Sequence, residues 1–177
     1  MNRPADISGK KLIEQIQKNQ IKEVISTPDF VQLSVHKALD QPGSGVRVTY
    51  CANENQALHV ASGMIIGGQS PLVMMQNQGL HNCINTLRTC GLDARLPLFL
   101  MIGQFGREFA NIGQDSRLSR RRMVNLLLPI LDAMKISTWT IDDDTQIPRF
   151  QDAWRHCQAN QAPTALVIGH YTAWDCV

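Results

Sequence analysis

Three short stretches of the sequence carry polar side chains of catalytic type directly after runs typical of buried strands. They are Ser26 to Phe30 (STPDF), Cys51 to Asn55 (CANEN) and Met75 to Asn82 (MQNQGLHN). In a doubly wound parallel sheet such strand ends share one edge, and ligands bind at that edge. We therefore expect the carboxyl and amide groups of these stretches to converge on one site. Its candidate residues are Asp29, Glu54, Gln76 and Asn77.

The same residues also have a purely structural interpretation. Asp29, Asn53 and Asn77 are residue types that cap helices. A carboxylate such as Glu54 is also favoured near a helix N-terminus by the helix dipole. Residue types and spacing leave the two interpretations open.

The elements that position these residues follow from hydrophobic periodicity. The pattern predicts helices at about 8–19, 29–40, 53–67, 79–90, 119–134 and 146–159. It predicts strands at about 22–26, 46–51, 71–76, 97–102, 136–140 and 164–168. Regular alternation of strand and helix indicates a parallel sheet of about six strands with helices on both faces, in a single domain spanning 1–177. The least regular section, Gly103 to Ser119, follows a strand, where such folds bind ligands.

Other motifs point to no alternative chemistry. Gly43 and Gly45 precede a strand, whereas a dinucleotide-binding turn places its glycines after one. The sequence has no nucleophile elbow, phosphate-binding Gly-Lys-Ser/Thr loop or H-E-x-x-H pair. The histidines are scattered, at 36, 59, 81, 156 and 170. Of these, His81 falls at the expected carboxyl edge of the sheet and is a site candidate.

Composition narrows the class of protein. The 177 residues are 44% apolar and 18% charged, with a net charge of +2, so bulk charge implies neither a nucleic-acid nor a membrane partner. The arginines in RLSRRRM (117–123) are typical of a solvated helix face, with anion binding at a partner interface as the alternative. Five cysteines form no C-x-x-C pair, so we expect reduced thiols and no metal site. With no apolar run near the roughly 18 residues of a membrane span, we expect a cytoplasmic protein.

Four segments resemble a known family. TPDF, ANENQALHVASGMIIGG, SPLVMMQNQGLHNCINTL and LPLFLMIGQFGRE are similar to the pyrimidine-binding domain of thiamine diphosphate-dependent decarboxylases, specifically the phosphonopyruvate and sulfopyruvate decarboxylase group. The likeness runs from about residue 12 to 168. Its most specific part is Glu54 with Gly63, followed by an apolar strand that ends in Gln-Asn-x-Gly-Leu-x-Asn.

The resemblance implies a role for each candidate residue. Glu54 would hydrogen-bond a ring nitrogen of the cofactor aminopyrimidine and favour the tautomer that activates the thiazolium for attack on a 2-oxo acid. Asp29 would be a second catalytic group, for proton transfer or substrate orientation. The residues expected to line the cofactor or substrate are Pro28, Gln76, Asn77 and Gly79. His81 and Arg107 are substrate candidates, although His81 replaces a common Gly and GQFGRE replaces the usual Trp-Arg-Gly loop.

The resemblance also implies a partner. The diphosphate half of such enzymes carries Gly-Asp-Gly and a downstream Asn that hold the divalent metal, and this sequence has no Gly-Asp dipeptide. We therefore expect a shared thiamine diphosphate, with Mg²⁺ held by a separate β-type subunit in an α2β2 assembly, and exposed apolar surface on this chain. Two alternatives remain. They are a noncatalytic or regulatory partner subunit with the same α/β fold, and a standalone doubly wound enzyme for another small ligand.

Overall fold

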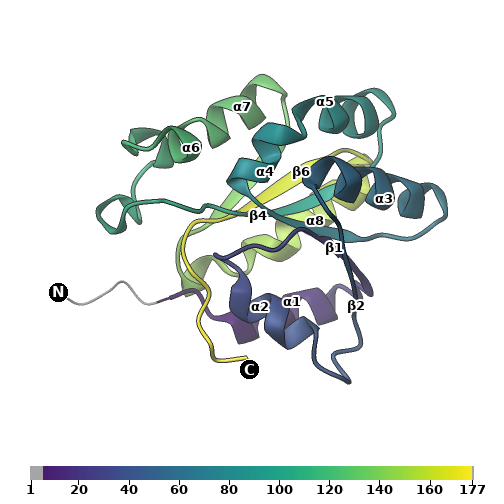
Figure 1. The fold of residues 1–177 in the computed structure, drawn as a ribbon, viewed down its shortest axis with the longest axis horizontal. Coiled ribbons are helices and arrows are strands. Elements are labelled where there is room, and N and C mark those ends of the chain that lie inside the picture. Colours follow the sequence, from purple (N-terminus) through teal and green to yellow (C-terminus); the bar gives the residue numbers. More distant parts are fainter. Residues whose placement is uncertain (1–5, 177) are drawn as a thin grey trace.

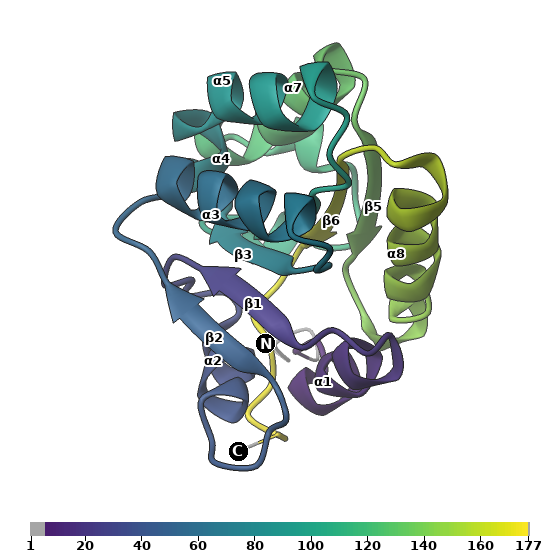
Figure 2. The same ribbon diagram turned by 90° about the vertical axis from the view of Figure 1, so that its right-hand side faces the viewer.

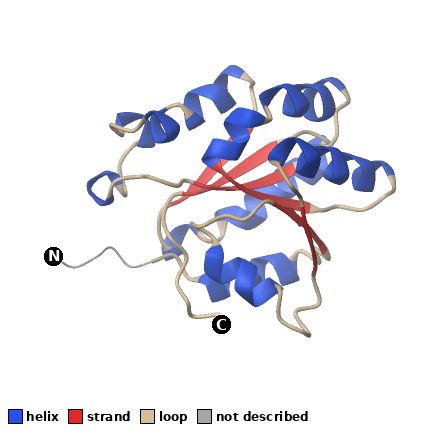
Figure 3. Cartoon of the chain, in the orientation of Figure 1, coloured by secondary structure: helices blue, strands red, loops and turns tan. Residues whose placement is uncertain are grey.

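The computed structural model describes residues 6–176 and contains one six-stranded sheet (Figures 1 and 3). All neighbouring strands are parallel, in the order β2-β1-β3-β4-β6-β5. The strands are β1 (Glu23–Ser26), β2 (Arg47–Tyr50), β3 (Leu72–Gln76), β4 (Phe99–Gly103), β5 (Ser137–Ile141) and β6 (Thr164–Ile168). The predicted fold class is confirmed, and each predicted strand is present.

Helices cover both faces of the sheet (Figures 1 and 2). One face packs against α1 (Gly9–Lys18), α2 (Leu33–Leu39) and α8 (Arg149–Asn160). The other face packs against α3 (Glu54–Ile66), α4 (Asn77–Asn82), α5 (Ile84–Thr86), the π-helix η1 (Leu87–Asp93) and α7 (Leu127–Ala133). Among residues 6–176, no helix is long and apolar enough to cross a membrane.

The two hydrophobic cores divide each central strand between them. In β4, Phe99 and Met101 belong to the core under α1, α2 and α8, whereas Leu100 and Ile102 belong to the core under α3, α4 and α7. All four side chains are fully buried. Successive side chains of a strand point to opposite faces, so a strand buried on both sides is apolar throughout, as the sequence pattern indicated.

Three predicted helices differ from the structure in their limits. The helix expected at 29–40 begins at Leu33, because a bend at residue 30 and a turn at residues 31–32 precede it. The helix expected at 79–90 begins at Asn77, directly after β3, and continues through α5 into η1. The helix expected at 119–134 is split into α6 (Arg122–Asn125) and α7. Pro129 lacks the N–H that would bond the Asn125 carbonyl, which explains the split.

The sheet reverses its winding at β1, because β1 pairs with β2 on one side and β3 on the other. A crevice at the carboxyl ends of such a pair is the usual ligand site of doubly wound folds. The irregular segment after β4 lies at the same edge. It contains the short 3₁₀ turns η2 (Phe109–Asn111) and η3 (Ser116–Leu118); a third such turn, η4 (Asp144–Gln146), follows β5.

Candidate functional site

The three polar junctions meet at the carboxyl edge of the sheet. The Thr27 hydroxyl, after β1, donates to Oε1 of Glu54 at 3.1 Å, which joins the β1 end to the start of α3. Gly79, in α4 after β3, lies so close that a Cβ atom there would overlap the side chain of Glu54. Glu54 therefore lies at the carboxyl edge of the sheet, between the end of β1 and the helix that follows β3.

The start of α3 is fixed by two side chains. Asn53 caps the helix by accepting from the Gln56 backbone N–H at 3.0 Å, and the Gln56 side chain accepts from the Ala52 N–H at 2.8 Å. This reciprocal pattern resembles a capping box and satisfies donors that would otherwise be free. It holds the backbone of Glu54, the first helical residue, in place.

The carboxylate of Glu54 is partly used and partly free. Its side chain is half-buried, and Oε2 has no hydrogen-bond partner within residues 6–176. Cys83 lies beside it; burial first, and then the charge of Glu54, raise the pKa of this thiol to about 12. The neighbouring sulfur therefore stays protonated at neutral pH. Glu54 is left as an oriented acceptor with one open oxygen.

Asp29 is almost fully buried, with 1% of its surface exposed. Its carboxylate accepts from the Val31 N–H at 2.7 Å and from the Gln32 side-chain amide. It lies against Gly103, where a Cβ would overlap its oxygen. Burial raises the pKa of Asp29 to about 6, against the opposing effect of these hydrogen bonds. The group shapes the turn before α2 and also titrates near neutral pH.

Asp29 gives a prediction for stability against pH. Its folded-state pKa of about 6 lies above the ordinary 3.8, so its contribution is most favourable below about pH 4 and is lost as pH rises through about 6. Relative to an Asp29→Asn variant, the wild type should lose about 3 kcal/mol of unfolding free energy between about pH 4 and 7. Urea unfolding of both proteins across this range measures the difference. A difference that is constant with pH would contradict the elevated pKa.

The residues at the β3 end have unequal roles. Asn77 is fully buried, and its amide donates to the backbone oxygens of Phe105 at 3.1 Å and Met123 at 2.8 Å. It therefore anchors the segment after β4. Gln76 is half-buried and its side chain has no hydrogen-bond partner among the described residues. Gln76 remains available to a ligand, whereas Asn77 is occupied.

The two substrate candidates lie in different surroundings. His81, near the end of α4, is half-buried, and burial lowers its pKa; it makes no hydrogen bond to Glu54 or Asp29 in the described chain. Arg107 is 2% exposed at its side chain and pairs with Asp142 at 2.6 and 3.0 Å. It also donates to Gln104, Asn111 and Gln114. The guanidinium donors of Arg107 are therefore engaged within the protein and are not available to a substrate in this structure.

A pocket of about 390 Å³ opens at the same edge of the sheet. We call it the α2 slot. It is lined by Pro28, Asp29 and Phe30 after β1, by Leu33, His36, Lys37 and Asp40 along α2, and by Tyr50 and Gln76 at the ends of β2 and β3. The sequence analysis did not single out His36; the spacing of Leu33, His36 and Lys37 along one side of α2 is the signal that points to it. In the described part of the chain, no group of three or more His, Cys, Asp or Glu side chains is arranged to hold a metal ion.

Comparison with known proteins gives a structural likeness only. No family model matches the chain, and a search of curated proteins gives no match. Among solved structures, the chain is similar to the Rhodococcus jostii RHA1 thiamine diphosphate-dependent 4-hydroxybenzoylformate decarboxylase, with a TM-score of 0.62 and 16% sequence identity. The match covers 94% of this chain and 31% of that chain. At this identity the likeness establishes a shared α/β fold, and this chain spans less than a third of its neighbour.

Proposed function

We propose that the chain is the pyrimidine-binding subunit of a thiamine diphosphate-dependent 2-oxo acid decarboxylase. The observation that carries the proposal is the setting of Glu54. Its carboxylate lies at the carboxyl edge of the sheet, accepts from Thr27 and packs against Gly79, and Oε2 has no hydrogen-bond partner among the described residues. The fold of the structural neighbour and the motif resemblance supply the reaction class.

The residues present fit the aminopyrimidine end of this cofactor. When bound, thiamine diphosphate supplies the electron sink for loss of carbon dioxide from a 2-oxo acid. Glu54 would use Oε2 to hold the proton shared with a ring nitrogen of the aminopyrimidine, while the Thr27 hydroxyl keeps Oε1 in place. Such an aligned hydrogen bond is stronger in a site from which a partner subunit excludes water than it is in bulk solvent. Gln76 would orient the cofactor or substrate through its free amide.

We place the diphosphate and Mg²⁺ on a second, β-type subunit, in a cytoplasmic α2β2 enzyme. Two observations support this part of the proposal. The first is that these 177 residues contain no Gly-Asp dipeptide. Large apolar side chains are also exposed near the carboxyl edge, with Phe30 59%, Phe109 52% and Trp174 57% accessible. Exposed aromatic groups of this kind are suited to the seam between two subunits.

Two classes of substrate are compatible with the reaction. The motif resemblance favours a small anionic 2-oxo acid with a phosphonate or sulfonate substituent. The structural neighbour acts on 4-hydroxybenzoylformate, which carries an aromatic substituent. Both are 2-oxo acids, so the choice between them does not affect the role of Glu54.

Calorimetry of the assembled enzyme tests the proposal. The tagged chain is expressed in its native cells, isolated with its bound partner, and titrated with thiamine diphosphate and Mg²⁺. We expect saturable binding to the complex and at least about a tenfold weaker binding to the chain alone, because the chain provides only the pyrimidine side. A complex that does not bind the cofactor would mean a noncatalytic partner subunit. Catalysis by the chain without a partner would instead mean a standalone enzyme.

A further inference from the structure

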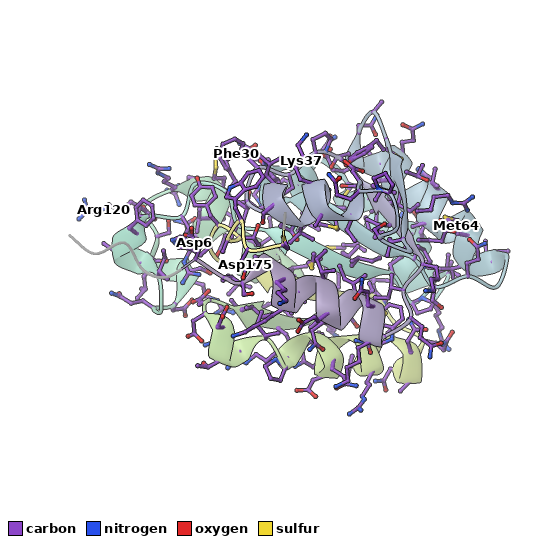
Figure 4. All side chains as sticks on the ribbon, turned by 90° about the horizontal axis from the view of Figure 1, so that it is seen from below. Asp6, Phe30, Lys37, Met64, Arg120 and Asp175 are labelled. Atoms are coloured by element: carbon purple, nitrogen blue, oxygen red, sulfur yellow. The ribbon has the colours of Figure 1, made fainter. Side chains whose placement is uncertain are left out.

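The α2 slot has walls suited to a flat, apolar group. Pro28, Phe30, Leu33 and Tyr50 form part of its lining. Phe30 is 59% and Tyr50 is 47% exposed, so both rings have apolar surface left to cover. Figure 4 shows Phe30 and Lys37, two residues of the slot, near one another. The volume of the α2 slot, about 390 Å³, is sufficient for a small ring-bearing ligand.

His36 gives the slot an unsatisfied polar group. The residue is 3% exposed, and neither ring nitrogen has a hydrogen-bond partner among residues 6–176. Burial lowers its pKa to about 4, with a smaller opposing effect from Asp40, so the ring is uncharged at neutral pH. A neutral imidazole offers one donor and one acceptor. A buried polar group without partners is costly, and a ligand hydroxyl or amide would remove that cost.

The charges around the slot do not favour an anion. Lys37 and Asp40 are both exposed and have opposite charges, and Asp40 accepts from the Tyr50 hydroxyl at 2.7 Å. The carboxyl group of Asp29 lies in the same lining. The lining therefore contains one ammonium and two carboxyl groups. A phosphonate or sulfonate would gain no net positive field here and would lose its hydration.

We propose that the α2 slot binds a planar, uncharged group bearing a hydroxyl or amide, and that His36 recognises this polar substituent. Assigning the group to the substituent of the 2-oxo acid rests on the proposed function. Binding by the slot itself does not, because every lining residue belongs to this chain. The slot thus selects an aromatic substituent over an anionic one.

Titration of the full chain with small probes tests this inference without cofactor or partner. The probes are p-cresol, toluene, which has the same ring and methyl group without the hydroxyl, and methanesulfonate. Backbone ¹⁵N–¹H NMR spectra report where each probe binds. We expect p-cresol to shift the amides of Leu33, His36 and Tyr50 saturably, toluene to bind about fivefold more weakly, and methanesulfonate to leave these amides unshifted. Equal affinity for p-cresol and toluene, or preferential binding of methanesulfonate, would overturn the proposal.

Two substitutions locate the recognition at His36. His36→Phe keeps an aromatic ring and removes both nitrogens, so p-cresol should bind about fivefold more weakly while toluene binds as before. His36→Gln retains a donor and an acceptor and should keep part of the preference. A preference for p-cresol that survives in His36→Phe would exclude His36. If a variant fails to fold, the relative affinities of the wild type for p-cresol, toluene and methanesulfonate still test the proposal. Because these titrations contain no cofactor, their outcome is independent of whether the proposed decarboxylation is correct.

Discussion

Glu54→Gln should lower kcat of the assembled enzyme about a thousandfold or more, while the fold and the subunit assembly remain unchanged. Glutamine has nearly the same shape, and its side-chain oxygen can still accept from Thr27, the contact that is 3.1 Å long in the wild type. The amide cannot carry the negative charge or exchange the proton that our proposal assigns to Oε2. The loss should therefore appear in kcat rather than in structure.

The measurement combines steady-state turnover with sedimentation of the complex. Glu14→Gln is the matched control, because Glu14 is an exposed residue of α1 and makes no hydrogen bond within the described chain. That variant should retain wild-type kcat. If Glu54→Gln retains it as well, Glu54 has no part in the chemistry. If the variant fails to assemble, the carboxylate has an interface role, and the catalytic assignment is wrong.

Arg107→Met should lower the free energy of unfolding by about 3–5 kcal/mol. The side chains of Arg107 and Asp142 are 2% and 11% exposed, and they form a bidentate pair. Removal of the arginine leaves a buried carboxylate without its counter-ion. It also removes the donors that hold Asn111 and Gln114 in the segment after β4.

Urea unfolding followed by circular dichroism gives the magnitude. The matched control is Arg155→Met, at an exposed arginine of α8 with no ion pair in the described chain, and it should change stability by no more than about 0.5 kcal/mol. Adding Asp142→Leu to Arg107→Met should recover much of the loss, because the unpaired charge is then gone. A single-variant loss below about 1 kcal/mol would show that water compensates the carboxylate.

Three glycines at the carboxyl edge have a common role. A Cβ at Gly79 would overlap Glu54, one at Gly103 would overlap Asp29, and one at Gly169 would overlap Asp142. Gly103 is the last residue of β4, Gly169 directly follows β6, and Gly79 lies in α4 after β3; at each position a side chain would occupy the space of a carboxylate. The acidic groups of the edge are therefore placed by the absence of side chains opposite them.

Hydrophobic pattern alone determined the architecture. In runs such as Leu72–Gln76 and Thr164–Ile168, most side chains are apolar whichever face of the sheet they point to. Both faces must therefore be covered, which is the arrangement of a parallel sheet between layers of helices. The same reasoning predicted that the strand ends meet. The position of Glu54 at the shared edge therefore follows from the sequence pattern.

Only the tertiary structure decided what each polar side chain does at that edge. Asn77 and Arg107 have residue types suited to a ligand, yet their donors bind the backbone and Asp142 instead. His36 appeared as one scattered histidine, yet it is buried in the lining of a pocket, and its ring nitrogens have no hydrogen-bond partner among the described residues. The physical reason is that hydrogen bonds and burial depend on partners far away in sequence, whereas periodicity reports only which face of an element is apolar.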